Sequence, residues 1–89
     1  AQRAHKDINS VSFNRKGSLI VSASDDETIK LWGSMTGECL KTFEGHSRCV
    51  NSTAFNQEGS KIVSTSDDAT IKIWDVNTGD CLKTIYGEA

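Results

Sequence analysis

The sequence predicts an all-β protein built from two copies of one four-stranded antiparallel unit. First, the chain repeats itself without gaps at an offset of 42 residues, so that residues 13–45 align with residues 55–87. About two thirds of these aligned positions are identical, which is typical of repeat folds. Second, apolar residues alternate with polar ones or form short β-branched runs, and no segment has the helical period of about 3.6. Third, the runs are separated by short Gly- and Asp-containing connections that suit hairpins.

The four strands of each unit follow from this pattern in chain order. The first strand alternates small polar and apolar residues, and the second has an Ile-Val centre typical of a strand covered on both faces. The third alternates and is rich in β-branched residues, and the fourth closes the unit. We therefore expect strands at residues 9–13, 18–24, 28–32 and 38–43 in the first unit and at 50–55, 60–66, 70–74 and 80–86 in the second.

The connections carry residues that favour tight turns. Gly17 and Gly59 end the turns after the first strands, where a positive φ is expected. The Asp-Asp pairs come next, and an aspartate side chain in such a turn can accept from nearby backbone amides. The pair at Asp25 and Asp26 also raises the alternative of a calcium site. Because no D-x-D-x-D-G loop surrounds it, we expect a solvated turn with one structural aspartate.

Composition narrows the partners and the compartment. The 89 residues carry a formal net charge of −2, which argues against nucleic acid or an anionic membrane as a partner. No run approaches the roughly 18 apolar residues of a membrane span, and the first ten residues lack the apolar core of a signal peptide. Cys39, Cys49 and Cys81 are odd in number and form no CxxC, which favours reduced thiols. We expect an intracellular protein, cytoplasmic or nuclear, with no metal and no cofactor.

Two dipeptides and two longer phrases carry a family resemblance. The dipeptides are Gly45-His46 and Trp74-Asp75, and the phrases S-x-S-D-D-x-T-I-K-x-W and T-G-x-C-L-K-T occur in both copies. Together they resemble the WD (tryptophan–aspartate) repeat of β-propellers, whose units are about 40–45 residues long. The resemblance covers nearly the whole chain. It implies two propeller blades, each a four-stranded antiparallel meander, over residues 1–45 and 46–89.

The resemblance also implies a hydrogen-bonded set of side chains in each blade, made of a turn aspartate, a loop histidine, a second-strand serine and a third-strand tryptophan. A buried indole N–H needs an acceptor, and a serine hydroxyl can accept from it while donating to the imidazole. The other imidazole nitrogen can donate to the carboxylate, so the set would fix strand register. The residues are Asp26, His5, Ser22 and Trp32 in the first blade and Asp68, His46, Ser64 and Trp74 in the second.

Catalysis is the alternative for this set, because serine, histidine and aspartate also form a nucleophilic triad. No G-x-S-x-G elbow is present in the sequence, and each serine lies inside an apolar strand. The set also occurs twice at equivalent positions, as a requirement of the fold would. We therefore expect a structural network and no enzyme.

The two copies differ in ways that predict inequivalent blades. Gly33 stands where the second copy has Asp75, so the first blade lacks a carboxylate near its third turn. The loop after His5 is one residue shorter than the loop after His46, which leaves the place of His5 less defined. Glu88 stands where a third repeat would have its histidine.

Two blades do not close a propeller. Closed rings have about 4–8 blades, and each blade buries its faces only against its neighbours. We expect identical chains to complete the ring, with a tetramer of eight blades favoured and a trimer of six blades second. An engineered unit and a fragment of a longer chain are the open alternatives.

The function that the resemblance implies is a non-enzymatic structural and protein-interaction scaffold. The alternative is a peptide- or protein-binding adaptor that uses the propeller face or the central channel. By alignment with the family, the candidate partner-binding face contains Lys6, Asp7 and Asn9 in the first unit and Arg48, Cys49 and Asn51 in the second. The competing interpretation is that these are solvated loop residues.

Overall fold

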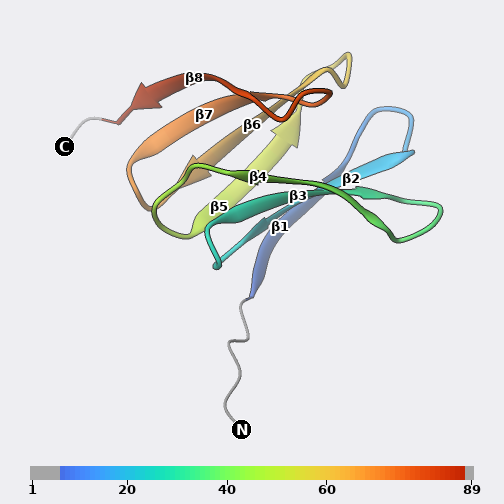
Figure 1. Ribbon diagram of the computed structural model, residues 1–89, viewed down its shortest axis with the longest axis horizontal. Coiled ribbons are helices and arrows are strands. Elements are labelled where there is room, and N and C mark those ends of the chain that lie inside the picture. Colours follow the sequence, from blue (N-terminus) through green and yellow to red (C-terminus); the bar gives the residue numbers. More distant parts are fainter. Residues whose placement is uncertain (1–6, 88–89) are drawn as a thin grey trace, which may run out of the picture.

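The protein consists of two four-stranded β-sheets (Figure 1). The structure is a computed structural model that describes residues 7–87, and this range contains no helix, so none that could cross a membrane. Strands follow chain order in each sheet, and neighbouring strands are antiparallel. The first sheet contains β1 (Ile8–Phe13), β2 (Leu19–Ser24), β3 (Thr28–Gly33) and β4 (Cys39–Glu44), and the second contains β5 (Val50–Phe55), β6 (Lys61–Ser66), β7 (Thr70–Asp75) and β8 (Cys81–Tyr86). The predicted all-β fold is confirmed, with every strand end within one residue of its expected position.

The two sheets share one strand register, irregularities included. The pairing of the first two strands shifts at Asn9 in the first sheet and at Asn51 in the second. The pairing of the last two strands shifts after Leu31 and after Ile73. All four positions are related by the 42-residue offset, so the repeat extends from the sequence to the backbone.

The turns after the inner strands adopt the predicted conformation. Gly17 has a φ of 77° and Gly59 a φ of 76°, so both occupy the left-handed region that favours glycine. This conformation lets each chain reverse within a few residues and feed β2 and β6 back along the inner strands.

The Asp-Asp turns are held by their own side chains. In the second sheet, the Asp68 amide donates to Oγ of Ser66 at 3.1 Å, and the Thr70 amide donates to Oδ1 of Asp68 at 2.9 Å. The first sheet repeats both bonds. Glu27 and Ala69 take positive φ values of 79° and 68° at the tips, a conformation that the side-chain bonds help to maintain.

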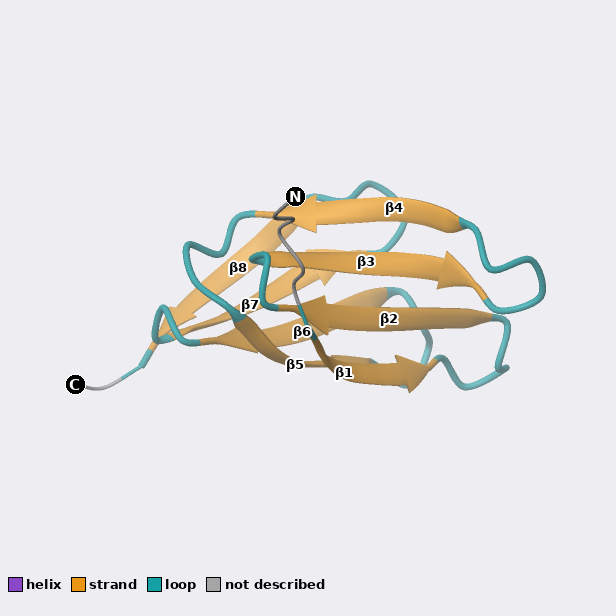
Figure 2. Cartoon of the chain, turned by 90° about the horizontal axis from the view of Figure 1, so that it is seen from below, coloured by secondary structure: helices purple, strands orange, loops and turns teal. Residues whose placement is uncertain are grey.

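The core lies between the two sheets, in an interface that we call the seam. The inner strands β1 and β5 lie side by side, and β2 also packs against β5. Figure 2 shows the sheets stacked one in front of the other, each extending from its inner to its outer strand. The rings of Phe43 and Trp74 meet edge to face across the seam, with centroids 5.7 Å apart. The buried apolar residues are Val21, Ala23, Ile29, Leu31 and Phe43 from the first sheet and Val50, Ile62, Trp74 and Val76 from the second.

Each sheet buries one face in the seam and turns the other outward, because side chains alternate along a strand. The outward face of the first sheet, the Trp32 face, contains Val11, Phe13, Ile20, Ser22 and Trp32. The outward face of the second sheet, the Ile85 face, contains Val63, Ile71, Ile73 and Ile85. Val11 and Phe13 are 61% and 63% exposed, so the Trp32 face carries apolar groups that residues 7–87 do not cover.

Candidate functional site

Four side chains of the second sheet form one continuous hydrogen-bond chain. The indole Nε1–H of Trp74 donates to Oγ of Ser64 at 2.9 Å, and the Ser64 hydroxyl donates to Nε2 of His46 at 2.7 Å. Nδ1–H of His46 then donates to Oδ2 of Asp68 at 2.9 Å. The direction is set by the two ends, because an indole N–H can only donate and a carboxylate can only accept. Trp74, Ser64 and His46 are at most 5% exposed, so water does not compete for these bonds.

Asp68, at the end of this hydrogen-bond chain, accepts several further hydrogen bonds. The amide and hydroxyl of Thr70 donate to Oδ1, and the Ser47 amide donates to Oδ2 at 3.0 Å. Oγ1 of Thr70 also lies 3.2 Å from Nδ1 of His46. Burial alone would raise the pKa of Asp68, but the hydrogen bonds from Thr70, His46 and Ser47 outweigh it and hold the pKa of this carboxyl well below its usual range. The charged carboxylate therefore fixes the tautomer of the imidazole.

The first sheet contains the same serine–tryptophan pair in a simpler setting. Nε1–H of Trp32 donates to Oγ of Ser22 at 2.9 Å, but Trp32 is only partly buried. Asp26 is exposed and accepts from the amide and the hydroxyl of Thr28, at 2.9 and 2.6 Å. Burial would raise the pKa of Asp26, and hydrogen bonds led by those from Thr28 outweigh it and lower the pKa. His5, which the family resemblance places in this set, lies outside the described residues.

The serine of the buried chain is not placed to attack a substrate. Ser64 is 0% exposed, and its oxygen lies between the Trp74 indole and the His46 imidazole. A nucleophile has to reach a substrate atom, and its base has to be free to take the proton. The arrangement instead ties β6 and β7 to the loop before β5.

The turns that join the third and fourth strands differ between the two sheets in the residue directly after the tryptophan. Oδ1 of Asp75 accepts from the amides of Asn77 and Thr78, at 2.8 and 3.0 Å. These bonds, with the Thr78 amide first, hold the pKa of Asp75 below its usual value. The turn after Gly33 has the same backbone, since in both turns the amide four residues on donates to the carbonyl at 2.8 Å. Gly33 therefore allows the same turn, but it has no side chain that could accept hydrogen bonds from the turn amides.

Asparagines on the candidate partner-binding face tie the inner strands to the Asp-Asp turns. Nδ2 of Asn9 donates to Oδ1 of Asp25 at 2.8 Å and to the carbonyl of Val50 at 2.9 Å, the second bond crossing the seam. Nδ2 of Asn51 donates to Oδ1 of Asp67 at 2.8 Å, which is the equivalent bond in the second sheet. Both asparagines are exposed, so this edge is held by polar contacts that remain accessible to a partner.

The other residues of this face lie around the same edge. Asp7 and Arg48 are exposed, and the Asp7 carbonyl accepts from the amide of Asp25 at 2.9 Å. Cys49 is partly buried, and the Asp25 carboxylate raises the pKa of its thiol, which stays protonated at neutral pH. Lys6 lies outside the described residues.

The cysteines and acidic residues do not assemble a metal site within residues 7–87. Cys39, Cys49 and Cys81 are all free. In that range, no three side chains of the metal-ligating types His, Cys, Asp and Glu come together. The Asp25–Asp26 turn is instead occupied by the Asn9 and Thr28 hydrogen bonds described above.

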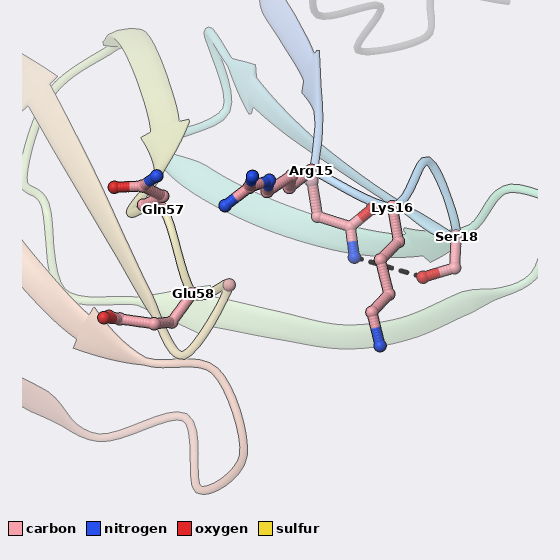
Figure 3. Close-up of a pocket in the computed structure, with 7 residues that line it drawn as sticks. Arg15, Lys16, Ser18, Gln57 and Glu58 are labelled. Carbon is pink, nitrogen blue, oxygen red and sulfur yellow. Dashed lines mark hydrogen bonds between the residues drawn. The ribbon is translucent and has the colours of Figure 1, made fainter.

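The opposite ends of the inner strands enclose an open hollow of about 690 Å³ between the turns 14–18 and 57–59 (Figure 3). The two turns are equivalent in the repeat but opposite in charge, since Arg15 and Lys16 stand where the second copy has Gln57 and Glu58. Figure 3 shows Arg15 extending toward Gln57 on the facing turn. A positively charged turn therefore faces a negatively charged turn across the hollow.

Comparison with known proteins identifies the family. The sequence model described as WD domain, G-beta repeat matches residues 2–33 and 37–75. These two matches cover most of the chain and include both tryptophans. The chain belongs to the WD-repeat family. The predicted resemblance is therefore confirmed, and the two sheets are the blades that the WD repeat predicts.

Individual WD-repeat proteins match shorter segments. A ribosome biogenesis protein BOP1 homolog from Drosophila grimshawi is 49% identical over 51 residues, which are 54% of this chain and 6% of the relative. The COMPASS component SWD3 of Saccharomyces cerevisiae is 44% identical over 43 residues, which are 48% of this chain and 14% of the relative. The chain spans only a small part of the length of these relatives.

The WD repeat as a sequence unit does not coincide with a sheet. The second match begins at residue 37, in the turn before β4, and ends with β7 at residue 75. It therefore joins the outer strand of the first sheet to three strands of the second. A WD repeat thus spans two neighbouring blades.

Two contributors to the site were not predicted from the sequence. Thr70 bonds to both Asp68 and His46, and a signal for it was present, because Thr28 occupies the equivalent position in the repeated phrase. The bond from Asn9 across the seam had no signal in the sequence, since it depends on how the two sheets stack.

Proposed function

We propose that this WD-repeat chain is a non-enzymatic protein-interaction scaffold whose blades assemble with blades of further copies into a closed β-propeller. One observation carries the proposal: each sheet buries one apolar face in the seam and leaves the other exposed. Val11 and Phe13 are more than 60% exposed on the Trp32 face, and Ile85 is 41% exposed on the Ile85 face. Contiguous apolar surface of this kind is typical of interaction sites.

Native mass spectrometry over a concentration series tests the assembly. We expect the tetramer with eight blades as the main species, at four times the 9.7 kDa of one chain, with the six-bladed trimer as the second candidate. A chain that is folded and monomeric at every concentration would refute the self-assembling scaffold.

The absence of enzymatic activity rests on the buried position of Ser64, whose hydroxyl is held between Trp74 and His46. We expect no hydrolysis of ester or peptide substrates by the wild type. Hydrolysis that Ser64→Ala removes while the protein stays folded would contradict this part of the proposal.

A second candidate function is a peptide- or protein-binding adaptor at the edge where the inner strands begin. The exposed side chains of Asp7, Arg48 and Asn51 at this edge support it. A pull-down from a peptide library tests it. Saturable binding that Arg48→Ala weakens at least tenfold, and that Glu58→Ala at the opposite edge leaves unchanged, is the expected result. Equal binding by both variants would exclude this edge.

The setting proposed for this scaffold is intracellular, cytoplasmic or nuclear. Three free thiols suit a reducing compartment, and one relative is named for ribosome biogenesis. A net charge of −2 favours protein partners over nucleic acid or a membrane. Location of the tagged chain in cell fractions tests this assignment.

A further inference from the structure

The seam between the two sheets provides a template for how one blade receives another. On the first-sheet side, Phe43 packs against the indole of Trp74, with centroids 5.7 Å apart. The methylene groups of Lys41 lie over Gly79, where a Cβ would come within 3.3 Å of them. Gly45 likewise lies against Trp74, since a Cβ there would come within 3.0 Å of the indole. The seam therefore brings together an apolar side chain, a lysine stem and two glycines at fixed positions.

A shift of 42 residues relates each of these seam residues to a counterpart on or beside an outward face. Ile85 on the Ile85 face is the equivalent of Phe43, and Trp32 on the Trp32 face is the equivalent of Trp74. Lys83 corresponds to Lys41. The glycines also recur, as Gly37 for Gly79 and Gly87 for Gly45.

The side chains at these shifted positions lack the partners that their counterparts have. Among the described residues, no heavy atom lies within 4 Å of a Cβ built on Gly37, whereas Gly79 meets Lys41. Ile8 is 59% exposed, whereas its counterpart Val50 is fully buried and accepts the Asn9 bond. The outward faces are therefore the two separated halves of a second seam.

Charge supports the same pairing. In the first seam, the Arg15–Lys16 turn faces the Gln57–Glu58 turn across the hollow. A second seam of the same geometry would place the Glu58 turn of one copy beside the Arg15 turn of the next. Opposite charges would again be neighbours, at every seam of the assembly.

We propose that a second copy of this chain docks head to tail, with its Trp32 face against the Ile85 face of the first copy. In this arrangement Ile85 covers Trp32 of the neighbour, Lys83 crosses its Gly37, and Asn51 donates to its Ile8 carbonyl. The inference rests on the proposed self-assembly and specifies its geometry, since two-fold pairing of like faces would give different contacts. Such a head-to-tail interface is heterologous, and it gives a ring when the rotation closes.

Two variants test whether the interface between copies is head to tail. Phe13→Glu places an unpaired charge on the Trp32 face, and Ile85→Glu does the same on the Ile85 face. Leu82→Glu is the matched control. Leu82 alternates with Lys83 and so lies on the Trp74 side of the second sheet, away from the Ile85 face. It is 50% exposed although the seam covers this side, so the position contributes to neither the seam nor the outward faces.

Head-to-tail docking predicts that each face variant is monomeric, with its assembly midpoint raised roughly a hundredfold or more. The equimolar mixture of the two variants then forms a heterodimer at twice the mass of one chain. The unmodified Ile85 face of one variant can still bind the unmodified Trp32 face of the other. The control assembles like the wild type. Circular dichroism checks the fold, and Val11→Glu with Val63→Glu repeats the experiment if either first variant is unfolded.

The outcomes separate this inference from the proposed function. If the wild type assembles but each variant alone still forms a homodimer, like faces pair and the head-to-tail geometry is wrong while self-assembly stands. Variants that stay monomeric in the mixture also overturn it. If the wild type never assembles, both proposals fail.

Discussion

The two blades have the same strands and register, but they hold their tryptophans in different surroundings. Trp74 is 1% exposed, lies in the seam and begins a hydrogen-bond chain that continues through Ser64 and His46 to Asp68. Trp32 makes the same bond to its serine on an outward face and is only partly buried. The difference arises from the neighbour, because the seam covers only one of the two tryptophan faces.

This comparison separates what a blade supplies from what its neighbour supplies. The bond from tryptophan to serine has a length of 2.9 Å in both sheets, so the β-meander alone is sufficient to form it. The burial that strengthens such a bond comes from the adjoining sheet. We therefore expect the second blade to depend on its network more strongly than the first, as long as the Trp32 face is free.

The largest expected effect on stability comes from replacing the tryptophans. Trp74→Ala should lower the free energy of unfolding by about 3–5 kcal/mol, because it leaves a large cavity in the seam. Trp32→Ala should cost about 1–3 kcal/mol, because less surface is buried there. Urea unfolding at a concentration that keeps the chain monomeric measures both. Equal losses in the monomer would contradict the contrast between the blades.

The serines test the hydrogen-bond chain with a smaller change. Ser64→Ala removes the acceptor for Trp74 and the donor to His46, and should cost about 2–3 kcal/mol because two buried groups lose their partner. Ser22→Ala should cost about 1 kcal/mol. The same urea titration measures the difference. Identical values would mean that the bond between Ser64 and His46 adds nothing to stability.

The aspartates give a pH-dependent test. Both Asp68 and Asp26 have a lowered pKa in the folded chain, so each stabilises the fold above its unfolded pKa of about 3.9 and loses that contribution as the pH falls below it. Asp68→Asn should cost about 1–2 kcal/mol at pH 7 and should flatten the loss of stability between about pH 5 and pH 2. Thermal melts over this range measure it.

Asp26→Asn is the matched variant for this test. Asp26 is exposed, and within residues 7–87 its carboxylate accepts from Thr28 alone, so its substitution should change the acid profile less. A larger flattening by Asp26→Asn than by Asp68→Asn would reverse the comparison.

The smallest expected effect is an increase in stability. Gly33→Asp should supply the cap that Asp75 gives to its own turn, and should raise the free energy of unfolding by about 0.5–1 kcal/mol. Its Cβ would come within 3.1 Å of Oγ1 of Thr36, and the second copy has the same pair of residue types at these positions, Asp75 and Thr78. Gly33→Ala is the control, since it has the Cβ without the carboxylate. A gain of the same size with alanine would show that the cap is not the cause.

Most of the fold could be predicted from the sequence because it is local. Alternation, β-branched runs and turn residues fix each strand relative to the next, and all strand ends lie within one residue of expectation. The members of the second-blade network could also be named, since the family phrase contains Ser64 and Trp74. Thr70 was not named, although its position in the same phrase pointed to it.

The stacking of the sheets could not be predicted. Both faces of each sheet carry apolar residues, and alternation alone does not say which face turns toward the neighbour. The bond from Asn9 to the Val50 carbonyl, and the greater burial of Trp74 over Trp32, follow from that choice. They depend on packing between residues about 40 positions apart, which no local pattern encodes.

The strand order has a consequence for how the chain reaches this fold. Because β3 and β7 are nearly identical, β2 could pair with either and keep almost the same side-chain neighbours. Three residues join β2 to β3, whereas about 45 separate β2 from β7. Closing the longer loop costs about 2 kcal/mol more, at roughly 0.6 kcal/mol for each doubling of length. Correct pairing is therefore selected by chain proximity and by the speed of hairpin closure, and dilute refolding conditions favour it over strand exchange between copies.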